Sequence, residues 1–433
     1  MRGQDKPSTC VIGLGYIGLP TAAIIARAGC PVTGIDVSQN VVDTINRGEI
    51  HIEEVDLDGL VRGVVQRGLL RASTRIVPAD VFVIAVPTPF AHDGNHTPDT
   101  SYVMAAATEM AGVLKRGDVV ILESTSPVGT TEAMRDLIAG LRPDLKLPGL
   151  THETPDIAIA YCPERVLPGR ILEELTNNDR SIGGITPRCA RKALAFYKRF
   201  VRASCVTTDA RSAEMCKLVE NSFRDVNIAF ANELSMIADK MGLDVWEVIR
   251  LANRHPRVNI LQPGPGVGGH CIAVDPWFIV HGAPDEARII RAARDINDSK
   301  MHHVVERATR LIEENPGVSV GCLGLAFKAN IDDFRESPAR FVTSRLAQKF
   351  GNRVRIVEPY AAELPREFEG TGAELIDLDS ALEECGVLIV LVDHDVFRVV
   401  PFEERSRAIV YDTRGIWPEA PIQAGNPGLR LAS

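Results

Sequence analysis

One cysteine directly follows a glycine-rich stretch, Gly264-Pro-Gly-Val-Gly-Gly-His-Cys271. Most single cysteines are inert buried thiols. Glycine-dense backbone, however, leaves a thiol approachable, and a thiolate can attack an aldehyde. The adduct can then lose a hydride, which turns a difficult second oxidation into an easier one. From its position alone, a catalytic and a structural role for Cys271 are equally open.

A second glycine pattern, Gly13-Leu-Gly-Tyr-Ile-Gly18, lies between an apolar run and a helical stretch. Its glycines allow a tight turn and let backbone N–H groups approach a pyrophosphate at a helix N-terminus. Asp36 ends the next apolar run, where an acid binds the ribose hydroxyls of NAD and repels a 2′-phosphate. We therefore predict an NAD site. The alternative is a glycine turn in an unrelated α/β domain.

The elements that position these loops alternate between short apolar runs and helical stretches. In the first part of the chain we predict strands at 10–13, 31–36, 81–86, 119–123, 157–161 and 181–184, with helices at 18–28 and 100–114. The alternation returns at 318–323, 353–357, 386–392 and 408–412, with a helix at 337–350. Such alternation favours parallel sheets covered on both faces. We therefore predict an α/β fold with two Rossmann-like domains.

A long helical pattern separates these two regions. Between 209 and 241, apolar residues recur at three- and four-residue spacing without glycine or proline, and a second helical stretch follows at 287–315. A helix of about 30 residues would be roughly 45 Å long. Because that length exceeds one domain, we expect this central helix to join the two Rossmann-like domains. It should also offer the surface for a homodimer or a higher homo-oligomer.

Composition restricts the partners and the compartment. The chain has 433 residues, a length typical of about three domains, and its net charge of −9 disfavours nucleic acid and anionic membranes as partners. Its nine cysteines include no C-x-x-C pair and no Cys/His metal spacing, so we predict reduced thiols and no metal site. We find no run of 18 apolar residues and no signal-peptide pattern. We therefore expect a cytoplasmic protein, with a poorly ordered tail at 418–433.

Six motifs in order make the sequence resemble the UDP-glucose/GDP-mannose dehydrogenase family. They are Gly13-Leu-Gly-Tyr-Ile-Gly-Leu-Pro20, Ser124-Thr-Ser-Pro-Val-Gly-Thr130, Cys162-Pro-Glu-Arg165, Lys217 with Asn221, the Cys271 loop, and Gly324-Leu-Ala-Phe-Lys-Ala-Asn330 with Arg335-Glu-Ser-Pro338. The resemblance implies an NAD-dependent, four-electron oxidation of the C6 alcohol of a UDP-sugar to a carboxylate, through a thiohemiacetal and a thioester on Cys271. It also implies an NAD-binding domain at 1–208, a helical dimerisation domain at 209–300 and a UDP-sugar-binding domain at 301–433.

Within that family the sequence is most similar to the members that act on UDP-N-acetyl-D-mannosamine. The segments that carry this likeness are 162–169, 221–227, 253–262 and 271–277. Two positions depart from the pattern of the UDP-glucose enzymes, since Pro168 replaces a second glutamate and Val274 replaces a lysine. Both departures would lie beside the sugar. They imply a 2-acetamido sugar rather than UDP-glucose, and they leave Glu164 to act alone.

Three other functions remain open. The same chemistry on UDP-N-acetyl-D-glucosamine would differ only in the shape of the pocket around C2. A two-electron β-hydroxyacid dehydrogenase would share a Rossmann domain and a long helix, but it needs neither the Cys271 loop nor a second nucleotide domain. A non-catalytic nucleotide-sugar sensor would be expected to lose Cys271, Lys217 or Asp275, and all three are present.

The resemblance assigns individual residues to three groups. The catalytic group is Cys271 as the nucleophile, Lys217 and Asn221 for the developing charge on the sugar, Asp275 as a partner of the water or base, Glu164 for thioester hydrolysis, and Thr125 near the nicotinamide. The cofactor-binding group is Gly13, Gly15, Tyr16, Ile17, Gly18, Asp36, Thr88 and Thr125. The substrate-binding group is Arg165, Lys217, Asn221, Arg257, Asn259, Gly268, Lys328, Arg335 and Arg414.

Several of these residues also have an ordinary structural explanation. Lys217 shares a helix face with Asn221, four positions further along the chain. Most lysines on helices, however, are simply solvated. Lys328, Arg335 and Arg414 lie at or after predicted strand ends, where open α/β sheets bind ligands and where cationic side chains suit phosphates. Solvated charges are the alternative for all three. Arg257 is expected to reach the substrate of a neighbouring subunit, so its role depends on the dimer.

Overall fold

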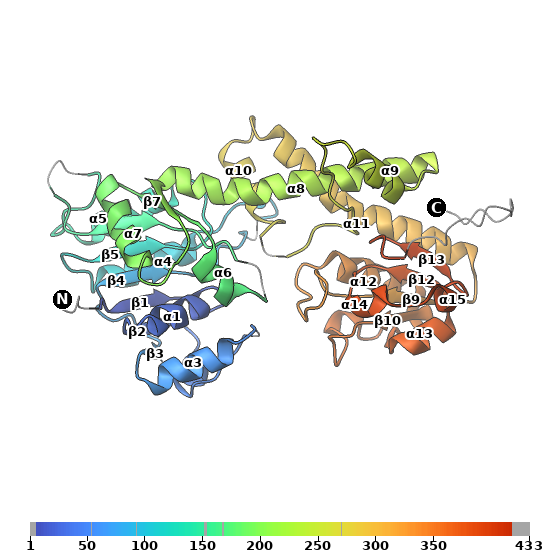
Figure 1. The fold of residues 1–433 in the computed structure, drawn as a ribbon, viewed down its shortest axis with the longest axis horizontal. Coiled ribbons are helices and arrows are strands. Elements are labelled where there is room, and N and C mark those ends of the chain that lie inside the picture. Colours follow the sequence, from blue (N-terminus) through green and yellow to red (C-terminus); the bar gives the residue numbers. More distant parts are fainter. Residues whose placement is uncertain are drawn as a thin grey trace. The chain divides into compact units, whose positions relative to one another are not determined.

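The computed structural model describes residues 6–52, 54–91, 93–150, 154–166, 169–269 and 271–417. The chain forms two compact units (Figure 1), the first made of Met1–Glu220 with Trp277–Pro284 and the second of Asn221–Pro276 with Asp285–Ser433. Each unit contains one sheet with helices on both of its faces. The predicted tail at 418–433 and the departure at Pro168 lie outside the described residues.

Eight strands form the sheet of the first unit, in the order β3-β2-β1-β4-β5-β6-β7-β8. Their bounds are β1 (Thr9–Ile12), β2 (Val32–Ile35), β3 (Leu70–Ser73), β4 (Val81–Ile84), β5 (Val119–Leu122), β6 (Ala158–Tyr161), β7 (Arg180–Gly184) and β8 (Cys205–Asp209). Neighbouring strands are parallel except β6 and β7, which are antiparallel. The six strands predicted from the sequence are confirmed. The sequence missed β3 and β8, because β3 is short and half exposed and β8 is a largely exposed edge strand.

Helices cover both faces of this sheet, which is why its central strands are continuous apolar runs. Helices α1, α3 and α7 pack on one face, and α4 and α5 pack on the other (Figure 1). The helices of the unit are α1 (Gly18–Arg27), α2 (Gln39–Asn46), α3 (Leu57–Gln66), α4 (Ser101–Ala111), α5 (Thr130–Leu141), α6 (Ile171–Asn177) and α7 (Pro187–Tyr197). Because β1, β4, β5 and β6 are parallel, their carboxyl ends lie on one edge, where ligands bind in such sheets.

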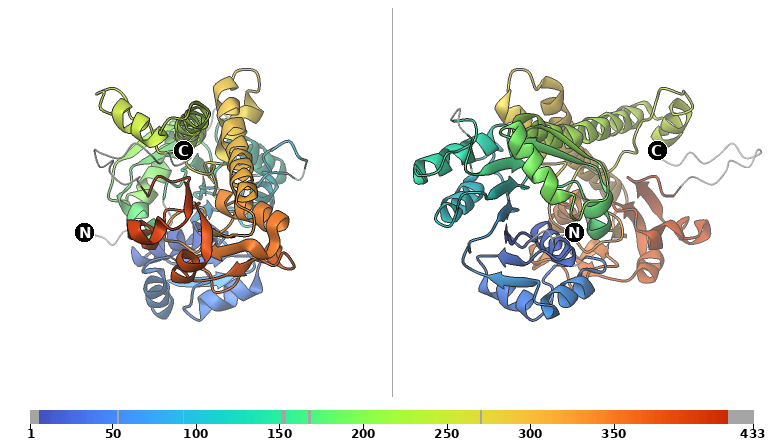
Figure 2. Two further views of the ribbon diagram at one scale, coloured as in Figure 1. Left: turned by 90° about the vertical axis from the view of Figure 1, so that its right-hand side faces the viewer. Right: turned by 60° about the vertical axis from the view of Figure 1, so that its left-hand side comes forward.

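The long helix predicted at 209–241 is confirmed as α8 (Ala210–Met241), whose 32 residues span about 48 Å. The helical stretch predicted at 287–315 is α11 (Arg288–Glu314). In the second unit, α11 packs beside α8 (Figure 2). The shorter helices α9 (Val245–Ala252) and α10 (Asp275–Gly282) lie between them in the chain.

Polar side chains line the contact between α8 and α11 and form a buried ladder. Arg294 Nη1 lies 2.6 Å from Asp225 Oδ1, and Asn297 donates to the same oxygen at 2.8 Å. Asn232 donates to Asn297 at 2.8 Å and accepts the Gly264 N–H at 2.9 Å. Because breaking a buried ion pair costs about 3–5 kcal/mol, this ladder strongly favours one register of the two helices. It also holds the start of the glycine-rich loop.

Five parallel strands form the sheet of the second unit, in the order β11-β10-β9-β12-β13. They are β9 (Ser319–Leu323), β10 (Val354–Val357), β11 (Glu374–Leu375), β12 (Cys385–Val390) and β13 (Ile409–Asp412), and the four predicted ones are confirmed. The two-residue β11 is too short to leave a sequence pattern. Helices α11 and α12 (Pro338–Phe350) cover one face, and α13 (Leu378–Glu384) with α14 (Asp395–Arg398) covers the other. The short helix α15 (Phe402–Arg405) precedes β13.

The predicted fold class, two Rossmann-like sheets with a long central helix, is confirmed. All nine cysteines lie within the described residues, and each is a reduced thiol. Within the same part of the chain, we find no helix with the length and the apolar composition that crossing a bilayer requires.

Candidate functional site

The glycine turn after β1 is closed by contacts that only glycine permits. Gly13 has a φ of +91°, and a Cβ on it would lie 2.6 Å from the carbonyl oxygen of Ala85. A Cβ on Gly18, the first residue of α1, would lie 1.7 Å from the carbonyl oxygen of Gly13. Gly15 differs, because the space around its Cβ position is open. The outer two glycines therefore shape the turn, and the middle one leaves the room that a diphosphate needs.

Asp36, directly after β2, is tied to this turn. Its Oδ2 accepts the Leu14 N–H at 3.2 Å, and its Oδ1 accepts the Ser38 N–H at 2.9 Å. Tyr16 is exposed and Ile17 is half-buried, so both border the turn from the solvent side. The structure thus brings the predicted acid and the predicted glycine motif together at one edge of the sheet.

Two threonines lie further along the same edge. Thr88 follows β4 and donates its hydroxyl hydrogen to the carbonyl oxygen of Thr125, which follows β5, at 2.6 Å. The sheet order places β4 next to β1 and β5 next to β4, so these loops lie on one side of the position, between β1 and β4, where the order of strands reverses. In open α/β sheets this reversal is where a dinucleotide lies.

Glu164 follows β6 and is buried in the first unit. Its Oε1 lies 2.5 Å from Nη1 of Arg180, the first residue of β7. Burial raises the pKa of Glu164, whereas the charges of Arg180 and of the buried Lys217 lower it, and the net direction is upward. Two residues with expected catalytic roles, Glu164 and Lys217, therefore belong to one buried electrostatic cluster.

Arg165 uses its guanidinium within the protein. Its Nη1 donates to Glu220 at 2.5 Å, and its Nη2 donates to the carbonyl oxygen of Asp179. Asn178 donates to the backbone oxygen of Arg165 at 2.8 Å. If Arg165 binds substrate as predicted, the substrate has to replace one of these partners.

In the second unit, Cys271 is exposed at the head of a turn that leads into α10. Its carbonyl oxygen accepts the N–H groups of Val274 at 3.1 Å and of Asp275 at 2.9 Å. The carboxylate of Asp275 is buried and accepts a hydrogen bond from Asn221 of α8 at 2.5 Å. The loop that carries Cys271 is therefore held at both ends by asparagines of α8, by Asn232 at its start and by Asn221 at its end.

Close packing also joins this loop to the segment 327–338. A Cβ on Gly268 would lie 2.4 Å from the carbonyl oxygen of Glu336 and 2.6 Å from Cδ of Pro338. A Cβ on Gly264 would lie 2.6 Å from Nη1 of Arg414. The structure therefore brings the Cys271 loop next to the regions that carry the predicted phosphate-binding side chains.

Lys328 is half-buried on the loop after β9, and two buried side chains anchor this loop. Glu358, at the end of β10, accepts the Leu325 N–H at 2.6 Å and lies 3.3 Å from Nε2 of His394. His394 accepts the Asn330 N–H at its Nδ1, at 2.9 Å. Burial alone would raise the pKa of Glu358, but the hydrogen bonds from His394 and the backbone hold it below its usual value.

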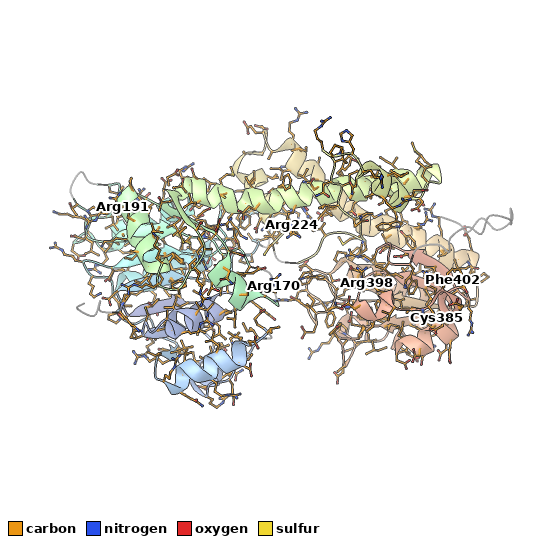
Figure 3. The ribbon with its side chains drawn as sticks, viewed as in Figure 1. Arg170, Arg191, Arg224, Cys385, Arg398 and Phe402 are labelled. Carbon is orange, nitrogen blue, oxygen red and sulfur yellow. The ribbon has the colours of Figure 1, made fainter. Side chains whose placement is uncertain are left out.

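The two predicted arginines of this unit already have acidic partners. Arg335 is exposed and lies 2.6 Å from Asp333. Arg414 lies 2.6 Å from Asp393, which also pairs with Arg398 at the end of α14 (Figure 3). A phosphate that binds Arg335 or Arg414 would compete with these carboxylates for the guanidinium group. Phosphate binding would therefore require each arginine to exchange its acidic partner.

Arg257 and Asn259 lie in an exposed loop after α9. Asn253 closes this loop, because its side chain accepts the N–H of Ile260 at 2.7 Å and donates to the oxygen of Ile260 at 2.9 Å. The loop is thus well defined although its side chains are exposed. The substrate-binding roles predicted for Arg257 and Asn259 stay predictions, and the role of Arg257 depends on the dimer.

Sequence inspection overlooked Arg180, Glu123 and Tyr197, which surround Glu164 in the interior. The available signal was a charged residue opening the otherwise small and apolar strand 180–184, and a glutamate ending the apolar strand 119–122. It also did not indicate that Trp277, the last residue of the segment 271–277, stacks on His96 with a centroid distance of 4.4 Å.

Three domain signatures of one family match the chain in order. They describe the NAD binding domain at residues 8–201, the central domain at 211–299 and the UDP binding domain at 321–419. The chain belongs to the UDP-glucose/GDP-mannose dehydrogenase family. It is an NAD-dependent dehydrogenase of the nucleotide-sugar type.

Individual members of the family are similar over nearly the whole chain. An NDP-N-acetyl-D-galactosaminuronic acid dehydrogenase from Ralstonia nicotianae is 55% identical over 97% of this chain and 98% of its own length. A UDP-N-acetyl-D-mannosamine dehydrogenase from Salmonella typhi is 55% identical over 94% of this chain and 98% of its own length. The solved UDP-D-ManNAc dehydrogenase from Pyrococcus horikoshii has a TM-score of 0.83 and 37% identity, over 96% of this chain and 97% of that one.

NAD fits the sheet edge of the first unit. The open space at Gly15 and the close approaches at Gly13 and Gly18 suit a diphosphate at the start of α1. Asp36 offers carboxylate oxygens beside that turn, and Thr125 lies on the neighbouring loop. The cofactor of the family and the geometry of this edge therefore agree.

Replacing the acid beside the glycine turn should change the choice of cofactor. We expect the wild-type enzyme to prefer NAD over NADP by at least about tenfold in kcat/KM, or ~1.4 kcal/mol, because Asp36 repels a 2′-phosphate. Asp36→Ser should narrow this gap, whereas Asp43→Ser, which removes an exposed acid from α2, should not. Equal kcat/KM values for NAD and NADP in the wild-type enzyme would contradict this role of Asp36.

Proposed function

We propose that this enzyme oxidises the C6 alcohol of UDP-N-acetyl-D-mannosamine to the carboxylate, with two NAD reduced for each sugar. The observation that carries the four-electron chemistry is the exposed Cys271 on a loop fastened at both ends to α8. The acetamido sugar is supported by Val274, which stands where UDP-glucose enzymes carry a lysine. It is also supported by the 55% identity to the Salmonella typhi enzyme.

A second acetamido sugar is favoured by one specific observation. The Ralstonia nicotianae relative is just as similar, and its name refers to N-acetyl-D-galactosaminuronic acid. The parent sugar, N-acetyl-D-galactosamine, differs from N-acetyl-D-mannosamine in its configuration at C2 and C4, and both sugars carry the same reacting C6 alcohol. UDP-N-acetyl-D-glucosamine is the third member of this set, and UDP-glucose is the disfavoured one.

In the first oxidation, the C6 alcohol loses a proton and a hydride to become an aldehyde. We assign Lys217 and Asn221 to stabilise the negative charge that develops on the C6 oxygen, because both are polar groups held on α8. The 2.5 Å bond from Asn221 to Asp275 keeps the amide of Asn221 oriented. Bound NAD would supply the acceptor for the hydride, and we assign Thr125 to its nicotinamide end.

In the second oxidation, the thiolate of Cys271 adds to the aldehyde carbon. The new carbon–sulfur bond and a proton on the oxygen give a thiohemiacetal, which loses its hydroxyl proton and a second hydride to become a thioester. Water then adds to the thioester carbon, and Glu164 takes a proton from it. The carbon–sulfur bond breaks, and the product carboxylate and the Cys271 thiolate separate.

We assign the nucleotide end of the substrate to the second unit. Lys328, Arg335 and Arg414 would meet the diphosphate, because they lie on the loops after β9 and β13, beside the glycine loop. Accordingly we propose an NAD-binding domain at 1–208, a dimerisation domain at 209–300 and a UDP-sugar-binding domain at 301–433.

The substrate and the number of electrons are tested together. Initial rates with NAD should be highest with UDP-N-acetyl-D-mannosamine, when it is compared with the N-acetylgalactosamine, N-acetylglucosamine and glucose nucleotides. Complete conversion of a limiting amount of the preferred sugar should yield about two NADH per sugar, since alcohol to acid is a four-electron oxidation. One NADH per sugar would indicate a simple alcohol dehydrogenase, and none with any of the four would indicate a sensor.

Removing the thiol should separate the two oxidations. Cys271→Ser should lower complete turnover by several orders of magnitude, because a hydroxyl adds poorly to the aldehyde and its ester hydrolyses slowly. Mass spectrometry after acid quenching should find a sugar-nucleotide adduct at position 271 in this variant or in the wild-type enzyme. Cys205→Ser, which changes a half-buried thiol of β8, is the control and should turn over normally. Wild-type turnover by Cys271→Ala would refute the covalent mechanism.

The exposed apolar side chains of α8 lead us to propose a homodimer. Phe223, Phe230 and Ile237 lie seven residues apart along the helix and are 68%, 55% and 44% exposed. A second copy that packs on this face would remove that apolar surface from water. The predicted role of Arg257 across subunits depends on this dimer.

Light scattering should therefore report at least twice the 47.1 kDa of one chain. Phe230→Glu should shift the protein toward the monomer, because it places a charge in the apolar contact. Phe402→Glu, at a 44% exposed phenylalanine on α15 (Figure 3), should leave the assembly unchanged. A stable wild-type monomer at working concentration would contradict the proposed dimer.

A further inference from the structure

A buried cluster of charged side chains surrounds Glu164 in the first unit, and the mechanism above uses only one member of it. The cluster contains two carboxyl groups, those of Glu123 after β5 and of Glu164 after β6, and the guanidinium of Arg180 at the start of β7. Glu123 is 2% exposed, Glu164 8% and Arg180 4%. Charged groups at this depth are retained only where their neighbours compensate them.

The contacts form a continuous path through the interior. Arg180 Nη1 lies 2.5 Å from Glu164 Oε1, and its Nη2 donates to the oxygen of Leu175 at 3.0 Å. The guanidinium carbon lies 4.8 Å from the centre of the Tyr197 ring. The Tyr197 hydroxyl donates to Glu123 Oε1 at 2.6 Å. Arg180 and Tyr197 therefore stand between the two carboxyl groups.

The two buried cations of this region act unequally on the two carboxyl groups. Arg180 lies 2.5 Å from Glu164, and the charge of Lys217 also acts on Glu164, whereas the side-chain partners of Glu123 are the neutral hydroxyls of Tyr197 and Thr21. Because a buried carboxylate without a directly paired cation is costly, the proton is held more readily by Glu123. Burial and the neighbouring Glu164 charge raise the pKa of Glu123 to about 7, although Arg180 opposes them.

Other polar groups reach the cluster from several elements. Thr21 of α1 lies 3.4 Å from Glu123. Cys162, after β6, stays a neutral thiol because burial raises its pKa to about 12, and burial likewise raises the pKa of Tyr197 well above its usual value. Lys217 of α8 acts on the other carboxyl group. Glu123 is therefore the member of this cluster that titrates near neutral pH.

We propose that Arg180 is a positioning residue for Glu164, and that Glu123 sets the basicity of Glu164 by gaining or losing one proton. The inference rests on the proposed function, in which Glu164 assists hydrolysis of the thioester. With Glu123 neutral, the whole charge of Arg180 acts on Glu164 and weakens it as a base. When Glu123 is ionised, it shares Arg180, and Glu164 accepts a proton more readily.

The affected step is the attack of water on the thioester. The water oxygen bonds to the thioester carbon, one of its protons passes to Glu164, and the carbon–sulfur bond breaks to release the Cys271 thiolate. The second proton leaves when the product acid ionises. Both hydrides have already left the sugar at this stage, so Arg180 and Glu123 should affect hydrolysis and not the two oxidations.

The positioning role is tested with Arg180→Met and with Arg180→Lys, which keeps the charge. After rapid mixing with NAD and UDP-N-acetyl-D-mannosamine, Arg180→Met should form NADH in a burst at the wild-type rate. Its steady state should then be at least about tenfold slower, with a thioester on Cys271 in acid-quenched samples. Arg180→Lys should recover part of the steady-state rate. A burst and a steady state that fall together would overturn the positioning role.

The proton on Glu123 is tested through the pH profile. The kcat of the wild-type enzyme should rise with pH through about 7, and Glu123→Gln should flatten this rise. Asp118 is a matched control, because it is a buried acid at the opposite end of β5 and lies 2.5 Å from its partner Lys115. Asp118→Asn should keep the wild-type profile even if it lowers stability. A wild-type profile in Glu123→Gln would overturn the proposal.

A stability measurement tests the same proton without substrate. The pKa of Glu123 is higher in the folded chain, about 7, than its ordinary value of 4.5, so the folded protein holds more protons between these values. The free energy of unfolding of the wild-type enzyme should therefore fall as pH rises from about 5 to 7, relative to Glu123→Gln. If the free energy of unfolding changed with pH in the same way in the wild-type enzyme and in Glu123→Gln, Glu123 would not hold the proton and the proposal would be overturned.

These measurements separate the inference from the proposed function. If none of the sugar nucleotides is oxidised, the proposed function and the hydrolytic role of Arg180 are wrong, while the stability curves still decide whether Glu123 holds the proton. If two NADH form per sugar and Glu123→Gln changes neither the pH profile nor the stability curve, the function stands and the inference is wrong.

Discussion

The arrangement of the second unit depends on the buried polar stripe of α8. Asn221, Asp225 and Asn232 lie on one face of this helix, and each needs a partner, because an unpaired buried polar group costs about 1–3 kcal/mol. The partners come from three places, namely the start of α10, α11 and the glycine loop. Because all three side chains of α8 must be paired, the rotation of α8 is fixed, and both ends of the loop that carries Cys271 are held in place. An exposed thiol can thus be held in place without being buried.

The two Rossmann-like sheets share one hydrogen-bonding arrangement, but the acid that makes it is exposed to a different degree in each. In each, an acid at the end of the second strand binds the backbone of the glycine turn after the first strand, Asp36 with Leu14 and Glu358 with Leu325. Asp36 remains half-exposed and can meet ribose hydroxyls. Glu358 is buried beside His394, so it supports the loop instead of meeting a ligand. Burial decides which acid is available to a nucleotide.

The two groups proposed to react, a thiol in the second unit and a carboxyl group in the first, differ in their exposure to solvent. The proposed nucleophile, Cys271, is exposed, and its loop is held by backbone hydrogen bonds and by the Asn221–Asp275 pair. The proposed base, Glu164, is buried beside Arg180, and burial outweighs this cation in setting its pKa. A thiol needs access to the sugar, whereas a carboxylate that acts on water gains basicity when it is removed from bulk solvent.

The sequence by itself determined most of the elements, the family and the cofactor, and it suggested the reacting residues. Hydrophobic periodicity located ten of the strands and the long helix, since a buried parallel strand and an amphipathic helix leave strong local patterns. Glycine spacing with Asp36 indicated the cofactor, and the family motifs indicated Cys271 and Glu164. The short edge strands β3 and β11 escaped prediction because too few of their residues are buried to leave a pattern.

Only the tertiary structure decided which side chains share an environment. Arg180 and Glu123 are 57 positions apart in the numbering, and nothing in their local sequence shows that both face Glu164. Nor does the sequence show that two asparagines of α8 hold the ends of the Cys271 loop. Burial and pairing across the sheet set the proton affinities here, and those are properties of neighbours in space, which a linear pattern does not record.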